Sequence, residues 1–378
     1  MANAHIPHEL RLRAGEQVEV RSKSEILSTL DPSGRLDGLP FMPEMFAHCG
    51  RPLRVYKHAH KTCDPPNGLG ARRMDRAVHL EQIRCDGSAH GDCQAGCLIF
   101  WKEAWLKRVD PLAASDSAGP RESVPEKISL SSGAGCTEED VLKDCTVAGT
   151  ENDPEGPTYR CQNLLVPEAT EPLKWWDFRQ YVEDYTSGNA SLGRIFAALV
   201  FTIYQMISEL GIGIGSAMRF AYDTFQRLIG GSVFPTRLGT IPVGQRTPTV
   251  KLGIQEGDWV RVKSYREILE TLDENWHNRG MYFDGDQVPF CNGTYRVHKR
   301  VEQIINEKTG KMMNFKTAAL ILEGVACQAK YAKCRKLCPR SIYSYWREIW
   351  LEPLSGQEAE TARSVHRADT SVLPPVGT

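Results

Sequence analysis

The sequence has almost no net charge, no apolar run long enough to span a membrane, and no Cys-x2-Cys pair. Its 46 Lys and Arg residues nearly balance its 47 Asp and Glu residues, so we expect no nucleic-acid partner. The first residues lack a basic start followed by an apolar core, so we expect no secretory signal and a cytoplasmic location. No Ser/His/Asp arrangement and no paired carboxylates stand at a useful spacing, so no pattern in the sequence names a reaction.

Cysteine, in contrast, is abundant, with 12 among the 378 residues. In a cytoplasmic chain of this length, reducing conditions argue against a disulfide framework. Metal ligation by thiolates explains the cysteines better, and buried inert thiols are the alternative.

The length predicts two or three domains, and the composition, 41% hydrophobic and 25% charged, is typical of a globular protein.

An internal match relates two parts of the chain. Residues 15–31 match residues 257–273, and the same offset aligns two cysteines of each part. Two more cysteines align after a slip of one residue. We interpret the match as duplication of one module, because chance does not place separated cysteines in register within such a match. The matched cysteines are Cys49, Cys85, Cys93 and Cys97 in the first copy and Cys291, Cys327, Cys334 and Cys338 in the second.

Each copy is predicted to fold as a small, mainly β module. Valines at period two in residues 17–21 indicate a strand, and residues 53–57 and 77–85 indicate two more. A helix capping box is indicated in each copy, at Ser22 with Glu25 and at Ser264 with Glu267.

The end of each module is predicted to be an amphipathic helix. In the first copy this helix covers residues 93–109, with Phe100, Trp101, Trp105 and Leu106 packing inward. The fold class that we expect is therefore α+β. It consists of two homologous mainly-β modules, resembling SH3-like barrels, each closed by a helix and joined by an insert with an α-helical segment.

Changes in composition divide the chain into six segments. They are the first module (14–109), a loop-rich insert with cysteines (110–170), a helical segment (171–235), a linker (236–254), the second module (255–353) and a disordered tail (354–378). Within the helical segment, residues 192–210 are apolar, but Arg194 and Glu209 bracket too few uncharged residues to span a bilayer. We expect this stretch to be buried between the modules, with contact to a membrane surface or a partner as the alternative.

Four cysteines in each module predict a metal site. Cys93 and Cys97 are four residues apart, so they share one face of the expected helix, and a helix N-terminus favours the thiolate form. Four thiolates suit a zinc ion and an iron–sulfur cluster equally, and the sequence does not decide between them. The lack of Cys-x2-Cys pairs argues against a zinc site. The Cys334-x3-Cys338–Pro339 segment resembles the end of a bacterial ferredoxin motif over this short stretch, which favours an iron–sulfur cluster.

The first module has further candidate ligands, which are His58, His60, Cys63 and His90. They could form a second metal site with an open coordination position, and a solvated loop is the alternative. Three cysteines of the insert, namely Cys136, Cys145 and Cys161, fit no ligand spacing.

These patterns favour a non-catalytic metal-binding protein that acts as a scaffold or accessory factor for a protein partner. One alternative is an iron–sulfur redox accessory enzyme with two clusters. Another is a zinc-dependent enzyme centred on the first module, because the additional histidines lie there and not in the second copy.

Overall fold

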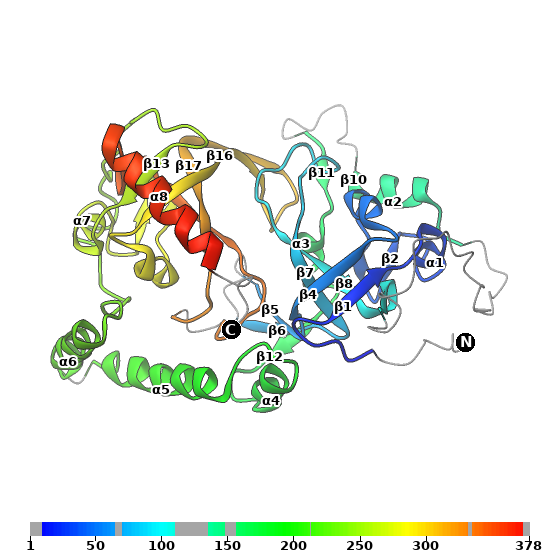
Figure 1. The fold of residues 1–378 in the computed structure, drawn as a ribbon, viewed down its shortest axis with the longest axis horizontal. Coiled ribbons are helices and arrows are strands. Elements are labelled where there is room, and N and C mark those ends of the chain that lie inside the picture. Colours follow the sequence, from blue (N-terminus) through cyan, green and yellow to red (C-terminus); the bar gives the residue numbers. More distant parts are fainter. Residues whose placement is uncertain are drawn as a thin grey trace. The chain divides into compact units, whose positions relative to one another are not determined.

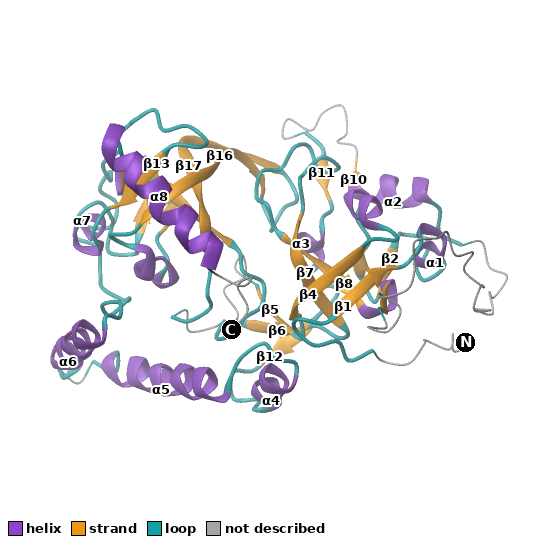
Figure 2. Cartoon of the chain, in the orientation of Figure 1, coloured by secondary structure: helices purple, strands orange, loops and turns teal. Residues whose placement is uncertain are grey.

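The structure is a computed structural model of the chain, and it describes residues 10–64, 70–109, 135–147, 156–211, 213–331 and 335–372. The chain forms two compact units. Unit 1 comprises Met1–Ser191 with Ile305–Met312, and unit 2 comprises Leu192–Ile304 with Met313–Thr378. The fold is mixed α+β with sheets predominating, as the sequence predicts at that level (Figure 1, Figure 2).

Unit 1 is built on a five-stranded sheet with the order β8-β7-β4-β1-β9. Its strands are β1 (Gln17–Val20), β4 (Pro52–His58), β7 (Ala77–Arg84), β8 (Leu98–Lys102) and β9 (Leu106–Arg108). All neighbouring strands are antiparallel. Val18 and Val20 are fully buried while the residues between and beside them are not, which is the alternation of a half-buried strand. The three strands predicted from the sequence are confirmed.

Unit 2 contains a second five-stranded sheet with the order β18-β17-β16-β13-β19. Its strands are β13 (Trp259–Val262), β16 (Thr294–Ile305), β17 (Met312–Ala326), β18 (Tyr343–Arg347) and β19 (Leu351–Pro353). When the strands are matched in chain order, both sheets have the same arrangement.

A short helix follows the first strand of each sheet. These helices are α1 (Lys23–Leu27) and α7 (Tyr265–Leu269), and both predicted capping boxes are present. In each box the serine hydroxyl accepts the backbone N–H of the glutamate, and the glutamate carboxylate accepts the serine N–H.

The predicted closing helix over residues 93–109 is wrong. Strand β8 is followed by the 3-10 turn η2 (Glu103–Trp105) and strand β9, and unit 2 repeats this arrangement with η5 (Glu348–Trp350). All five residues of β8 are buried, whereas an amphipathic helix would expose one face. Trp101 and Trp105 still lie in one core, because the 3-10 turn between two short strands returns the chain to the same side.

The segments outside the sheets are more structured than the sequence predicts. The insert contains α2 (Glu138–Cys145) and α3 (Gln162–Leu165), and the helical segment contains α4 (Arg179–Thr186), α5 (Leu192–Ser208) and α6 (Gly215–Ile229). Part of the tail that we expect to be disordered forms α8 (Gly356–Val372), whose Gln, Glu, Ala and Arg residues are strong helix formers, and residues 373–378 lie outside the described part of the chain.

The apolar stretch 192–210 forms α5, which buries only part of its surface. Ile195 and Ala198 are buried, whereas the side chains of Phe196 and Val200 are exposed. None of the helices in the described part of the chain combines the length and the apolar character that crossing a bilayer requires.

Candidate metal centre

Three side chains from separate elements of unit 1 meet at one end of the sheet. Glu44 lies in the 3-10 helix η1 (Pro43–His48), Cys85 follows directly after β7, and His90 lies in the loop that leads to β8. The Cys85 Sγ atom lies 3.0 Å from Glu44 Oε1, and His90 Nδ1 lies 3.5 Å from the same oxygen. Within the described ranges, this is the one group of at least three potential ligands whose atoms all lie within 4.8 Å of one another.

The loop that carries His90 is fixed by its own turn chemistry. The Asp86 carboxylate accepts the backbone N–H of Ser88, and Gly87 has a φ of +82°, a conformation that favours glycine. The backbone N–H of His90 donates to the Gly87 carbonyl at 2.9 Å. A Cβ atom at Gly87 would lie 2.1 Å from the Cys93 carbonyl oxygen, so only glycine allows the loop to fold this tightly.

The tautomer of His90 suits a metal ligand. Its Nε2 atom lies 3.3 Å from the Arg160 carbonyl oxygen, which can only accept, so Nε2 carries the proton. The lone pair of Nδ1 then faces Glu44 and Cys85. Metal-binding histidines typically donate their other ring N–H to a carbonyl or carboxylate in this way.

Two polar atoms at this site are buried without a hydrogen-bond partner among the described residues. They are Glu44 Oε2 and His90 Nδ1, and the two side chains are 5% and 0% exposed. A carboxylate and an imidazole lone pair that face one another in a buried site repel unless a proton or a metal ion lies between them. The donor set therefore fits a metal ion.

The thiol of Cys85 is protonated when no cation is present. Burial, followed by the charge of Glu44, raises the pKa of this thiol well above its ordinary value. Burial raises the pKa of the Glu44 carboxyl, but the hydrogen bond and the charge of His90 in its protonated form, together with the Cys85 thiol, outweigh burial and lower this pKa. The thiol can therefore donate its hydrogen bond to an ionised Glu44, and a metal ion would displace that proton.

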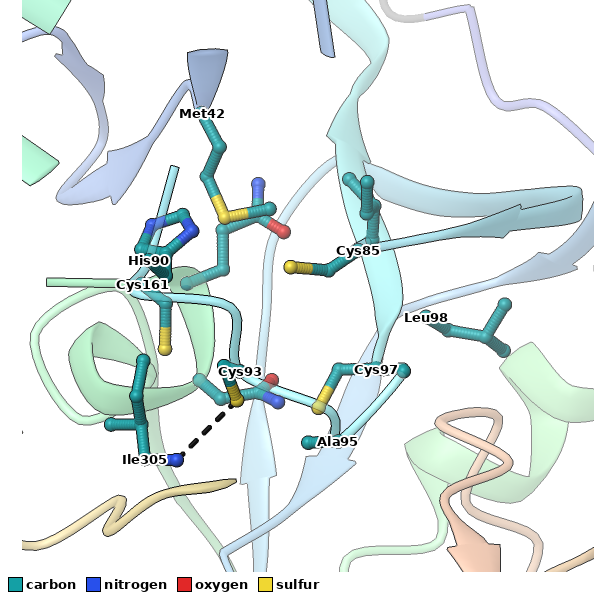
Figure 3. A pocket seen from close by; sticks show the side chains of 13 residues that line it. Met42, Cys85, His90, Cys93, Ala95, Cys97, Leu98, Cys161 and Ile305 are labelled. Atoms are coloured by element: carbon teal, nitrogen blue, oxygen red, sulfur yellow. Dashed lines mark hydrogen bonds between the residues drawn. The ribbon is translucent and has the colours of Figure 1, made fainter. Parts of the chain in front are cut away.

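More sulfur atoms surround the same space. Cys85 and His90 line a cavity together with Cys93, Cys97 and Cys161, and Figure 3 shows these sulfur atoms around one opening. The Cys93 sulfur accepts the backbone N–H of Ile305 at 3.3 Å. Three of the four cysteines predicted for the first module therefore lie around one cavity.

The fourth predicted cysteine of this set is elsewhere. Cys49 ends the 3-10 helix η1 and packs against the hydrophobic core, and it does not line the cavity. Cys161, which fits no ligand spacing in the sequence, lines the cavity in its place, because it immediately precedes α3. The other insert cysteines, Cys136 and Cys145, are buried and do not line it.

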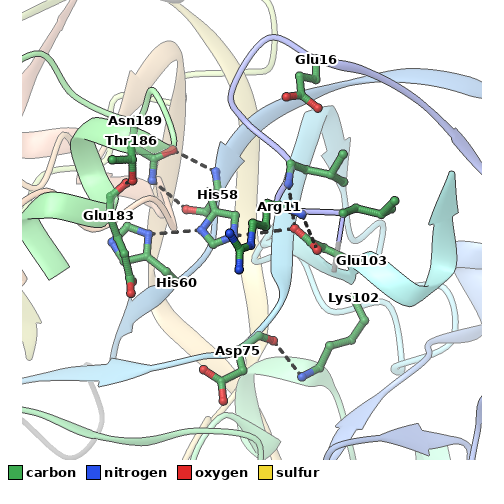
Figure 4. A network of polar contacts seen from close by, with 12 residues as sticks. Arg11, Glu16, His58, His60, Asp75, Lys102, Glu103, Glu183, Thr186 and Asn189 are labelled. Carbon is green, nitrogen blue, oxygen red and sulfur yellow. Dashed lines mark hydrogen bonds and ion pairs between the residues drawn. The ribbon is translucent and has the colours of Figure 1, made fainter. Parts of the chain in front are cut away.

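The remaining candidate ligands of the first module do not join His90. His58 and His60 stack with ring centroids 5.5 Å apart, and Cys63 is buried in β5 (Lys61–Cys63). His60 Nε2 lies 3.3 Å from Asp184 Oδ1. On its other side, His58 Nε2 lies 3.8 Å from Glu103, and Figure 4 shows His58 between His60 and Glu103. These side chains form a buried polar network that holds α4 and residues 11–12 against the sheet.

In unit 2 the matching positions make a simpler arrangement. Cys327 Sγ lies 3.5 Å from Asp286 Oδ2, as Cys85 lies beside Glu44, and Asp286 Oδ1 accepts the backbone N–H groups of Lys330 and Tyr331. This carboxylate is therefore satisfied by the main chain.

The other cysteines of the second set also differ in placement. The Cys85 N–H donates to the Cys97 carbonyl, whereas the Cys327 N–H donates to the Ile342 carbonyl. The Cys338 carbonyl therefore does not accept the Cys327 N–H, although the sequence aligns Cys338 with Cys97. Cys291 packs against the unit 2 core, and Cys334 lies outside the described residues.

Sequence reasoning missed Glu44 and Cys161. The available signal for Glu44 was the offset itself, which places the acidic residue Asp286 opposite it. The chain matches no known family model, and neither a curated protein nor a solved structure is significantly similar to it.

Proposed function

We propose that unit 1 binds one zinc ion through Glu44, Cys85 and His90, with Cys97 as the fourth ligand. The observation that carries this proposal is the pair of buried, unpartnered atoms, Glu44 Oε2 and His90 Nδ1, beside the Cys85 thiol. A divalent cation would satisfy both atoms and allow Cys85 to ionise, with its proton released to solvent.

The mixture of ligand types supports zinc over an iron–sulfur cluster. Zinc accepts sulfur, imidazole nitrogen and carboxylate oxygen in one tetrahedral site, whereas clusters are mostly held by thiolates alone. Cys97 is the natural fourth ligand because its backbone carbonyl accepts the Cys85 N–H and it lines the same cavity.

A second candidate rests on a different observation. Cys85, Cys93, Cys97 and Cys161 all line this cavity, and four cysteines are the usual ligand set of an iron–sulfur cluster. In that case the protein would be a redox accessory factor with one cluster in unit 1.

We propose a structural role for the zinc ion, in a scaffold or accessory protein that acts on a protein partner. Four protein ligands close the coordination sphere, whereas catalytic zinc keeps one position for water or substrate. Such an ion would tie the loop of residues 86–97 to η1, and removing it should loosen this end of the sheet.

We further propose that the two units are copies of one SH3-like module. Support comes from the equal strand order of the five-stranded sheets, the capping box after each first strand and the matched acid–thiol pairs Glu44–Cys85 and Asp286–Cys327. The second copy would then have kept the acid and thiol without the histidine.

Elemental analysis and a visible spectrum of anaerobically purified protein test the proposal. We expect a colourless protein with one zinc per chain. Cys85→Ser and His90→Gln should each lose the zinc, and cobalt substitution should give thiolate-to-metal charge-transfer bands that Cys85→Ser removes. Iron with acid-labile sulfide would support the cluster instead, and a protein without metal would refute both.

Two matched cysteine variants separate ligand loss from general damage. Cys49→Ser changes a cysteine that lies off the cavity, and Cys327→Ser changes the matched thiol in unit 2. Both should keep one zinc per chain. Loss of zinc in Cys49→Ser would mean that the ligand set has been assigned wrongly.

A further inference from the structure

Helix α5 carries a row of apolar side chains that face solvent along its length. Each of them is between 38% and 70% exposed, and they are Leu192, Phe196, Val200, Ile203 and Ile207, which we call the α5 stripe. Neighbours in the stripe are four, four, three and four residues apart. With 3.6 residues in a helical turn, these side chains fall within about 80° of the helix circumference, so they form one continuous face.

The opposite face of α5 is packed on other parts of unit 2. The buried residues of the helix lie on this side, and they are Ile195, Ala198, Gln205 and Ser208. The ring centroids of Phe201 and Tyr331 lie 5.1 Å apart. The Tyr204 hydroxyl donates a hydrogen bond to the Met218 carbonyl of α6. These contacts fix the orientation of the helix, so the stripe points away from the residues on which α5 packs.

The charges around the stripe do not suit a membrane surface. Helices that lie on a membrane carry Lys and Arg on their polar face, where these residues attract anionic lipids. Arg194 is the one basic residue in the sequence of α5, and its Nη2 atom lies 3.4 Å from the Gln328 carbonyl, to which it donates. Residues 195–208 carry no charge of either sign. The stripe therefore suits an apolar partner surface rather than an anionic membrane.

The area of the stripe matches the requirement of a homodimer. Met206 lies beside the stripe and is 47% exposed. If an apolar residue of this size presents about 150 Å² when fully exposed, the stripe and Met206 together offer on the order of 500 Å² on each chain. A standard interface buries about 800 Å² on each partner, and about 65% of a homodimer interface is apolar, which corresponds to about 520 Å².

We propose that the α5 stripe is the contact surface between two copies of this chain. In a two-fold dimer both partners use the same face, so one apolar face meets another and no charged group of residues 195–208 is buried. Spacings of three and four residues let the side chains of one helix fit between those of its partner. Val200 and Ile203 lie at the centre of the contact. This surface lies in unit 2 and is independent of the zinc proposal.

Sedimentation velocity of the full-length protein, over a concentration series that spans the micromolar range, tests the surface. We expect a reversible equilibrium between monomer and dimer. Ile203→Glu should raise the dissociation constant of the dimer at least about 100-fold, because the two-fold symmetry places two carboxylates in one apolar interface. An equimolar mixture of Ile203→Glu and Ile203→Lys should restore the dimer, because opposite charges then meet at its centre.

A matched control and three further outcomes make the test decisive. Leu142→Glu changes an apolar side chain that is 52% exposed on α2 of unit 1, and this variant should stay dimeric. A parent protein that is monomeric throughout the series, or a dimer that persists in Ile203→Glu, would overturn the proposal. A monomeric parent that floats with phosphatidylserine vesicles would assign the face to a membrane instead. A monomeric parent whose Tm falls on Ile203→Glu substitution would show that the stripe packs within its own chain.

Discussion

His58 is expected to make unit 1 sensitive to mild acid. This residue ends β4 with a side chain that is 18% exposed, and its Nδ1 atom lies 3.5 Å from Nδ1 of His60. Desolvation, followed by the charges of His60 and Arg73, lowers the pKa of His58 from 6.5 to about 4. The charge of Asp184 acts in the opposite direction but does not offset these effects. Glu103 lies 3.8 Å from His58, and its carboxylate accepts the N–H groups of residues 11 and 12.

The sign and size of the effect follow from proton linkage. His58 is neutral in the folded protein at pH 7, whereas in the unfolded chain it takes up a proton below pH 6.5. The stability that depends on neutral His58 is therefore complete above pH 6.5 and is lost as the pH falls toward 4. The difference between the two pKa values corresponds to about 2 kcal/mol at pH 5 and approaches about 3 kcal/mol at pH 4.

Urea unfolding at pH 7 and pH 5 measures this contribution. The free energy of unfolding of the parent protein should fall by about 2 kcal/mol more than that of His58→Gln, which cannot take up the proton. His298→Gln changes an exposed histidine of unit 2 and should behave like the parent. Equal losses in the parent and in His58→Gln would refute the reasoning.

Two further perturbations act on backbone fit and buried charge. Gly87→Ala should weaken zinc binding at least tenfold in a chelator competition, because the new Cβ would displace the Cys93 carbonyl. Gly50→Ala, also at positive φ but with open space around it, should cost only about 1 kcal/mol of stability and leave zinc affinity unchanged. The Lys61 ammonium lies 2.6 Å from the buried Asp184 carboxylate. Lys61→Met would leave this carboxylate without its counter-charge, and it should lower the free energy of unfolding by about 3–5 kcal/mol. The double variant Lys61→Met/Asp184→Leu should recover part of that loss in urea unfolding, and no recovery would contradict the uncompensated-charge explanation.

The strands were predictable because their signals are local. Valines at period two marked β1, and the Ser–Glu spacing marked α1 and α7, since each pattern is complete within a few residues. The closing helix over residues 93–109 was predicted wrongly because Trp101 and Trp105 are four residues apart. That spacing suits a helix, and two strands joined by a 3-10 turn satisfy it equally well.

The candidate site was predictable only in part, for a different reason. Cys85, Cys93 and Cys97 fall within one hairpin, so their proximity follows from a single loop. Glu44 and Cys161 reach the same place through tertiary packing of η1 and α3 against that hairpin, which no spacing in the sequence encodes. The offset between the copies helps with Glu44, but Cys161 has no counterpart in the second copy.

The two units should also respond differently to acid, because unit 2 holds an arginine at the position of His58. Glu103, which follows β8, corresponds to Glu348, which follows β18. The position that corresponds to His58 holds Arg300, whose Nη1 atom lies 2.8 Å from the Glu348 carboxylate. Arginine stays protonated throughout the accessible pH range, so Arg300 in unit 2 does not change its charge in acid, whereas His58 in unit 1 gains a charge. At pH 5 the structure around Glu103 should therefore open before the structure around Glu348. Amide hydrogen exchange can test the order directly, because faster exchange at residues 11–12 than at Leu252, whose N–H donates to Glu348, is expected at pH 5 once rates are compared with pH 7.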